Sequence, residues 1–330
     1  MSKNITIAGA SYADVPAITI PGTAGGLAKF VDVSGTTATA EDVATGKQFY
    51  GADGGLTVGT ASGGGGAGGA GDCLTVDGTV LDDSAFTGTG KTLYDIPSNI
   101  EKIESSAITA INDYAGYLYY SYGVDLSDSL RTLHLNNVTK IGSYGLYGRS
   151  FLADTRMLAL KKISKYAFYR CIRLVPTMPN LVEAGEYAFA YCFTNNSVQE
   201  YQFNNLAFGS RCLFDFSFKS NDTLKLPALR EIPTSLITNS PLLLVDIGAN
   251  VETVSANAIE LKNKLANVII RTPKPPVWVN TSTIDDLIRF TAYQATGHIY
   301  VPDDAVEAYK TAPGWERTAD RFLPLSAFPG

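Results

Sequence analysis

The sequence predicts a mainly β protein with short helices. We expect a small β-rich N-terminal module, a Gly-rich linker, and a solenoid of stacked repeats that ends in a C-terminal cap. Two observations support this: a strand-and-turn unit recurs through roughly residues 131–270, and a glycine run follows Ser62. The expected parts are a module at 1–60, a linker at 61–72, a solenoid at 73–277, and an insertion with a cap at 278–330.

The repeat is most visible in its turn, which follows the pattern Ile-Gly-x-Tyr-Ala-Phe. Clear copies begin at Ile141, Ile163 and Ala184, and fainter copies begin at Phe208, Ile232 and Val254. The steps between these first residues are 22, 21, 24, 24 and 22. A fixed period in the twenties is typical of leucine-rich-repeat solenoids, in which each unit buries its apolar side only against its neighbours.

The strands of the repeats are expected before these turns. They are predicted to end near Leu135, Leu160, Met178, Phe203, Leu226, Ile247 and Ile270. An earlier unit places Ile103 in the position of Ile141, and the 38 residues between the two predict an insertion centred on 112–123.

The N-terminal module reads as short β segments. Strands are predicted at 4–7, 17–20 and 30–33, a short helix at 39–46, and a hairpin at 49–58 with Asp-Gly at its turn. A second hairpin is expected at 74–81. So few apolar residues make a poor core, which favours a module completed by oligomerisation.

The C-terminal region is expected to close the solenoid. The proline run at 272–276 ends the regular repeats, and 284–290 is predicted to be helical. A last strand at 298–301 leads to a helix that begins near Asp303 or Asp304. Trp315 and residues 322–325 are expected to cover the end of the core, because the last repeat has no neighbour.

Charge and composition point away from several functions. Lys plus Arg is 26 against 32 acids, a net charge of −6, which argues against nucleic acid as a partner. The two histidines, His134 and His298, are 164 residues apart, and no nucleophile or metal-ligand motif is present. We therefore expect no enzyme activity, no metal and no cofactor. Glu101, Glu104, Asp125 and Asp128 could in principle hydrolyse a glycan, but they read as ordinary surface.

The cysteines and the chain start bear on the compartment. None of the four cysteines (Cys73, Cys171, Cys192 and Cys212) sits in a CxxC pair. Cys171 and Cys192 occupy the same place in consecutive repeats, as small buried residues or as a disulfide if the protein is extracellular. The N-terminus lacks the features of a signal peptide, and no apolar run suggests membrane insertion.

A cluster of tyrosines is the main candidate for binding. It comprises Tyr114, Tyr117, Tyr119, Tyr120 and Tyr122. Tyrosine combines a rigid apolar ring with a polar tip, which suits recognition at a low entropy cost. One interpretation is a loop that contacts a host-surface glycan or protein. In the other, alternate tyrosines pack on the first repeat and the rest are solvated.

Two stretches resemble known families. Residues 38–60 resemble a short module of phage and prophage tail proteins, through Asp42-Val43, Gly46-Lys47, Phe49-Tyr50 and Gly59-Thr60. Residues from about 93 to 275 resemble BspA-like leucine-rich repeats, whose first half is matched by 224–232 and second half by 163–171. The copies at 208 and 232 depart most from that pattern.

Together the resemblances imply a phage tail fibre, or receptor-binding protein, located in the virion. Its N-terminal module would join other tail or baseplate proteins and form a homotrimer, and its repeats would attach to the host bacterial surface. A BspA-like bacterial surface adhesin is the alternative, and a tail-associated glycan hydrolase is a third.

Overall fold

The structure is a computed structural model of the 330-residue chain. It describes six strands within residues 3–58, and then residues 80–83, 89–96, 100–118, 129–279, 287–292 and 295–330. The chain divides into two compact units, Met1–Thr75 and Val76–Gly330. Across the described segments, no helix has the length and apolar character needed to cross a membrane.

The first unit contains three antiparallel strand pairs. They are β1 (Lys3–Ile7) with β2 (Ala10–Val15), β3 (Ala17–Pro21) with β4 (Leu27–Val31), and β5 (Gln48–Tyr50) with β6 (Leu56–Val58). The hairpin predicted at 49–58 is therefore confirmed. The helix predicted at 39–46 lies outside the described residues, as does most of the hairpin predicted at 74–81.

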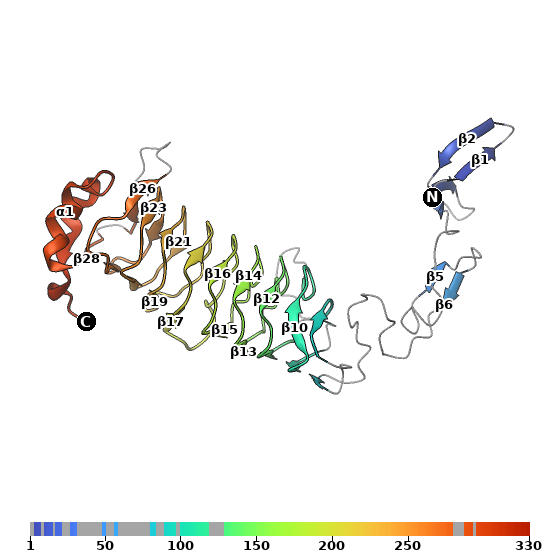
Figure 1. The fold of residues 1–330 in the computed structure, drawn as a ribbon, viewed down its shortest axis with the longest axis horizontal. Coiled ribbons are helices and arrows are strands. Elements are labelled where there is room, and N and C mark those ends of the chain that lie inside the picture. The colour runs from blue at the N-terminus through green and yellow to red at the C-terminus, as the bar shows by residue number, and fades with distance from the viewer. Residues whose placement is uncertain are drawn as a thin grey trace. The chain divides into compact units, whose positions relative to one another are not determined.

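The second unit is a solenoid in which each coil contributes strands to parallel sheets (Figure 1). Along one side run a five-stranded and then a six-stranded sheet. The first contains β7 (Val80–Asp82), β9 (Lys102–Glu104), β11 (Thr132–His134), β13 (Asp154–Arg156) and β15 (Val175–Thr177). The second contains β17 (Glu200–Gln202), β19 (Thr223–Leu226), β22 (Leu244–Ile247), β25 (Asn267–Ile270), β28 (Ile299–Val301) and β29 (Phe322–Pro324).

The next strands along each coil form three further sheets. The first holds β8 (Lys91–Leu93), β10 (Ile108–Ile111), β12 (Lys140–Ile141), β14 (Lys162–Ile163), β16 (Glu183–Ala184) and β18 (Phe208–Gly209). The second holds β20 (Glu231–Ile232), β23 (Thr253–Ser255) and β26 (Val277–Val279). The third holds β21 (Ile237–Ser240), β24 (Ile259–Leu261) and β27 (Ile288–Phe290).

The core is made of equivalent residues stacked from coil to coil. In β19, β22 and β25, Leu224, Val245 and Val268 lie in register, and all three are fully buried. A one-residue slip would turn each of them to solvent, so alternation of apolar and polar residues fixes the register. Phe168, Phe189 and Phe214 extend the stacking to aromatic rings, with centroids 5.5 and 5.8 Å apart.

Three of the predicted positions are shifted in the structure. Met157 directly follows β13, just as Leu135 directly follows β11. The end of this strand was predicted near Leu160, which is three residues later. Ile111, not Ile103, pairs with Ile141, and Ile103 lies in the preceding strand.

The third shift concerns Phe208. Gly209 pairs with Ala184, so the fainter copy begins one residue later than predicted, and Phe208 is 49% exposed.

The buried cysteines belong to a row of hydrogen-bond donors. The Sγ atoms of Cys171 and Cys192 donate to the carbonyls of Leu146 and Phe168, at 3.2 and 2.9 Å. In the next two coils Ser217 and Ser240 donate to the carbonyls of Phe189 and Phe214. Cys171, Cys192 and Cys212 are thiols, so the disulfide alternative does not hold for them.

In the first coil of this donor row the position is Arg149, which is only 1% exposed. Its guanidinium donates to the carbonyls of Gly116 and Ile96, at 2.7 and 2.9 Å. The expectation of small apolar residues was thus correct for burial but missed the polar function, which is to satisfy buried carbonyls.

The C-terminal cap begins after β28, with a 3₁₀ turn (Asp303–Ala305) and α1 (Val306–Thr311). A 3₁₀ helix (Glu316–Arg321), β29 and a last 3₁₀ turn (Leu325–Ala327) follow. Tyr309, Trp315 and Phe322 are buried against one another at the end of the solenoid, as predicted for Trp315 and Phe322. The helix predicted at 284–290 is wrong for its described part, because Ile288–Phe290 is β27, which pairs with β24.

Candidate recognition surface

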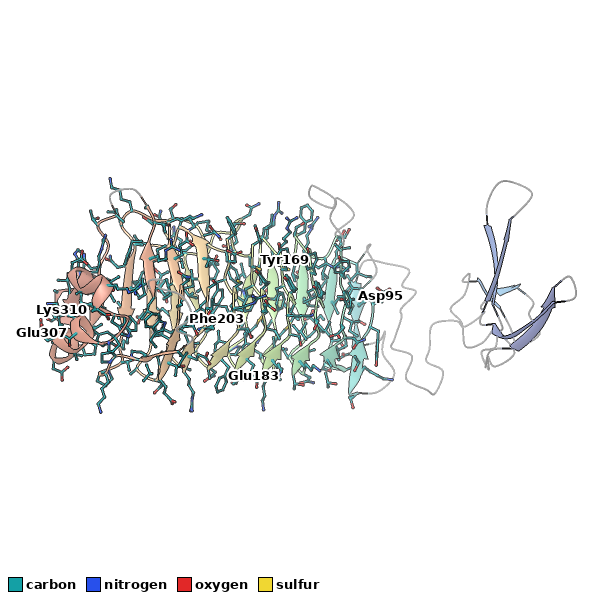
Figure 2. The ribbon with its side chains drawn as sticks, turned by 90° about the horizontal axis from the view of Figure 1, so that it is seen from above. Asp95, Tyr169, Glu183, Phe203, Glu307 and Lys310 are labelled. Atoms are coloured by element: carbon teal, nitrogen blue, oxygen red, sulfur yellow. The ribbon has the colours of Figure 1, made fainter. Side chains whose placement is uncertain are left out.

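Nine aromatic rings form two rows along one side of the solenoid. We call them together the tyrosine face. Row A is Tyr114, Tyr144, Tyr166 and Tyr187, with successive ring centroids 4.9, 4.9 and 5.0 Å apart. Row B is Tyr117, Tyr147, Tyr169, Tyr191 and Phe216, with centroids 5.0, 4.8, 5.3 and 4.9 Å apart. In Figure 2, Tyr169 and Glu183 lie toward opposite long edges of the solenoid.

The turn after the second strand of each coil holds row A in place. Tyr144, Tyr166 and Tyr187 have left-handed backbone conformations, with φ of 58, 57 and 53°. Each donates its backbone N–H to a carbonyl of the next coil; for Tyr144 this is Lys165, at 3.0 Å. Left-handed backbone is costly for a residue with a Cβ. The chain therefore keeps rings at positions where glycine or asparagine would be easier.

Row B changes backbone position partway along. Backbone bonds join Gly148 to Tyr169 and Arg170 to Ala190, so Tyr191 occupies the place that Arg170 holds one coil earlier. The ring pair Tyr169–Tyr191 is accordingly tilted by 59°, whereas Tyr147–Tyr169 and Tyr191–Phe216 are nearly parallel. The order Phe-Tyr-Arg-Cys in one repeat and Phe-Ala-Tyr-Cys in the next produces this shift.

Positive charge lies directly beside the rings. The guanidinium of Arg170 is 5.8 and 5.6 Å from the ring centroids of Tyr169 and Tyr191. Lys165 lies 6.0 Å from the Tyr144 centroid, and Lys262 lies 5.5 Å from that of Phe216. In such contacts the cation is attracted by the quadrupole of the ring.

The acids around the tyrosine face are engaged by their own chain. Glu186 forms an ion pair with Arg211. Asp215 accepts hydrogen bonds from the side chains of Thr238 and Asn239. These two acids are therefore less available to an incoming ligand.

Four hydroxyls of the tyrosine face have a raised pKa and therefore remain protonated at neutral pH. Burial, and then the neighbouring Tyr169, raise the pKa of Tyr147 to about 12. Burial also raises the pKa of Tyr166 and of Tyr191. For Tyr187 the leading cause of its raised pKa is a hydrogen bond with Cys212. Each hydroxyl can thus both donate and accept a hydrogen bond.

The predicted tyrosine cluster overlaps this face only in part. Tyr114, which is 57% exposed, begins row A, and Tyr117 begins row B. Tyr119, Tyr120 and Tyr122 lie outside the described residues. Residues 112–117 form the ordinary turn of the repeat, so Tyr114 and Tyr117 belong to the regular repeat and not to an added loop.

The other ring positions were not identified as binding residues from the sequence. The signal for them was present, because Tyr144, Tyr166 and Tyr187 share the fourth place of the turn pattern. This fourth place was interpreted only as part of the repeat turn, so the alignment of its rings into one continuous surface was not predicted.

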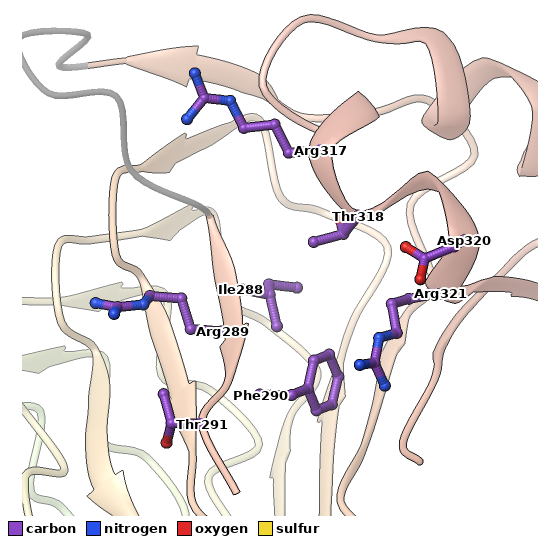
Figure 3. A pocket seen from close by; sticks show the side chains of 8 residues that line it. All are labelled: Ile288, Arg289, Phe290, Thr291, Arg317, Thr318, Asp320 and Arg321. Atoms are coloured by element: carbon purple, nitrogen blue, oxygen red, sulfur yellow. The ribbon is translucent and has the colours of Figure 1, made fainter. Parts of the chain in front are cut away.

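A hollow of about 420 Å³ lies between β27 and the cap (Figure 3). Its charged residues are Arg289, Arg317, Arg321 and Asp320. Arg321 donates to the carbonyls of Ala295 and Gly297, both at 2.9 Å, and lies 5.1 Å from the Phe290 centroid. Arg321 therefore ties the strand region of β27 to the cap, which is a structural function.

The remaining candidate groups give weaker sites. His134 lies between Asp154 and Glu104 across neighbouring strands, at 2.9 and 3.8 Å, in a row of surface ion pairs. Within the residues that the structure describes, no group of three or more His, Cys, Asp or Glu could hold a metal ion. Glu101 and Glu104 are exposed, while Asp125 and Asp128 lie outside the described residues.

Comparison with known proteins identifies the repeats. The sequence model described as the BspA type leucine rich repeat region matches residues 139–266 in six copies. This stretch is thus a BspA-type leucine-rich-repeat domain. A leucine-rich repeat protein from Bacteroides ovatus is a structural match at 12% identity, over 74% of this chain and 87% of that chain, with a TM-score of 0.21. No curated protein matches the chain.

Proposed function

We propose that this protein is a non-catalytic recognition protein that attaches to a bacterial surface through its tyrosine face. The observation that carries the proposal is the alignment of nine rings into one partly exposed surface. Contiguous aromatic surface of this kind is characteristic of interaction sites, and tyrosine is enriched there. The BspA-type repeats supply the rigid support on which such a surface can be precise.

Within this function we favour a phage or prophage tail fibre. The support is the resemblance of residues 38–60 to tail-protein modules. In this proposal the N-terminal unit joins other tail or baseplate proteins and forms a homotrimer, and several faces on one particle provide avidity. A BspA-like surface adhesin is the second candidate, and the repeats fit it equally well.

The test is adsorption of the fluorescently labelled full chain to a panel of bacteria. The variant Tyr147→Asn/Tyr169→Asn should lose at least tenfold of its adsorption, because it removes two adjacent rings of row B. The control Arg289→Gln changes an exposed side chain at the cap hollow and should adsorb normally. Equal adsorption of both variants would remove the tyrosine face from the function.

Two measurements separate the alternatives. Light scattering should give a trimer for the full chain, and purified phage tails should capture the full chain through residues 1–60 if it is a tail fibre. An adhesin would be found on the cells that produce it. Release of reducing sugar from host polysaccharide, abolished by Glu104→Gln, would instead establish the glycan hydrolase.

A further inference from the structure

The ring spacing and the polar edge of the tyrosine face restrict the kind of molecule that fits it. We propose that the face binds an extended glycan chain lying along the solenoid axis, with one sugar residue per coil. This inference rests on the proposed function and names its ligand class.

The distance between equivalent rings in successive coils matches a sugar chain. Equivalent rings recur at 4.9, 4.9 and 5.0 Å in row A. A sugar residue in an extended chain has nearly this length, so successive sugars stay in register with successive coils. A peptide strand does not, because its side chains on one face recur every ~6.6 Å, twice the ~3.3 Å rise per residue. It would be out of register within a few coils.

The tyrosine face offers a ligand more hydroxyl groups than open ring faces. Rings inside each row stack on their neighbours, so their faces are largely occupied. Among the nine rings, only Tyr114 at the start of row A and Phe216 at the end of row B are exposed, at 57 and 40%. A largely apolar protein partner would need open ring faces. A glycan needs paired donors and acceptors, which the protonated hydroxyls supply.

The two rows lie side by side, so that one ring of row A neighbours one ring of row B within a coil. The distance between ring centroids is 5.6 Å for Tyr114 and Tyr117, 5.6 Å for Tyr144 and Tyr147, and 5.4 Å for Tyr166 and Tyr169. Each of these three coils therefore presents one tyrosine from each row, side by side, to one segment of a ligand.

The experiment uses the full chain and surface polysaccharide from the adsorbing bacterium. The polysaccharide is delipidated, digested with protease, cleaved with mild acid and fractionated by length. Calorimetry or biosensor titration should show affinity rising with each added sugar and levelling at four to five residues, the number of rings in rows A and B.

Two variants sharpen the test. Tyr147→Phe/Tyr169→Phe keeps the rings and removes two hydroxyls, and should lower affinity about tenfold. Asn239→Tyr adds a ring after Phe216, at a backbone position with a φ of 52°, and should move the plateau by one sugar. Circular dichroism checks that both variants are folded.

Several results would overturn the inference. A single sugar that binds as tightly as the longer fragments would exclude an extended chain. Loss of adsorption when cells are treated with protease, with no competition by the polysaccharide, would identify a protein ligand. In that case the proposed function stands and only the glycan inference fails. Adsorption that is indifferent to the tyrosine face would reject both.

Discussion

The two halves of the repeat region share one turn geometry but carry different side chains on it. Tyr144, Tyr166 and Tyr187 place rings in row A, whereas the following coils have Cys212, Ser235 and Asn257 there, with φ of 54, 56 and 52°. The backbone is left-handed throughout, so the turn forms without a ring. The turn itself therefore does not require the rings of the first half, and recognition is the explanation that we favour for them.

The buried donor row gives the opposite result, because it continues through both halves. Arg149, Cys171, Cys192, Ser217 and Ser240 each donate a hydrogen bond to a carbonyl of an earlier coil. The side chains differ in size and charge, but the donor is kept. A donor kept in five successive coils while its side chain changes belongs to the fold, whereas the ring of row A is replaced by cysteine, serine and asparagine without loss of the turn.

The largest loss of stability is expected from Arg149→Met. It leaves the carbonyls of Gly116 and Ile96 without their buried donor, and each unsatisfied group costs about 1–3 kcal/mol. We expect the free energy of unfolding to fall by about 3 kcal/mol in urea denaturation followed by circular dichroism. A loss below about 1 kcal/mol would show that the donor row is not needed by the fold.

A smaller effect is expected in the middle of the same row. Cys192→Val removes the thiol donor from the Phe168 carbonyl, which still accepts the backbone N–H of Cys171 at 3.0 Å, and should cost about 1 kcal/mol in the same assay. Cys192→Ser keeps a donor, as Ser217 does one coil later, and should cost less. If serine is as harmful as valine, packing of the thiol and not its hydrogen bond is what matters.

Tyr166→Asn tests the ring rows directly. It removes two stacked ring pairs, worth about 0.5–1.5 kcal/mol each, but relieves about 1 kcal/mol of left-handed strain. The expected net loss is about 1 kcal/mol, with Asn257 as the natural precedent for asparagine at this position. A loss as large as that of Arg149→Met would break the distinction between the two rows.

The smallest effect concerns alkaline pH. The pKa of Tyr147 is raised from 10.0 to about 12 in the folded protein. The stability linked to that shift is fully present below about pH 10 and is lost as the pH rises through about 12. Denaturation midpoints measured across this window should therefore fall, and fall less steeply in Tyr147→Phe. An identical slope in both proteins would contradict the assignment.

The repeat architecture was predictable because the period of the turn is visible in single residues. The Tyr-Ala-Phe copies at 166–168 and 187–189 mark both the turn and the buried ring. The cap was predictable from Trp315 and Phe322, which have no other place to be buried. Register errors arose where two apolar residues compete for one position, as Met157 and Leu160 do.

The candidate site was less accessible from sequence. Five clustered tyrosines drew the prediction to 114–122, whereas the surface is built from residues about 20 positions apart that only coil stacking brings together. Local density in sequence is a poor guide to a surface in a solenoid, because neighbours across coils are one whole repeat apart.

The sheets of the solenoid end in different coils. The β7–β15 sheet ends before β17, but β16 still pairs with β18, whose own sheet ends before β20. The coil from 200 to 218 therefore pairs with the preceding coil through β18 and β16, and with the following coil through β17 and β19. Phe203, Phe214 and Phe218 pack together inside it. Because the two interruptions lie at different boundaries, each boundary of this coil is still crossed by one sheet, so a molecule proposed to bear load between a particle and a cell has no boundary here at which both sheets stop.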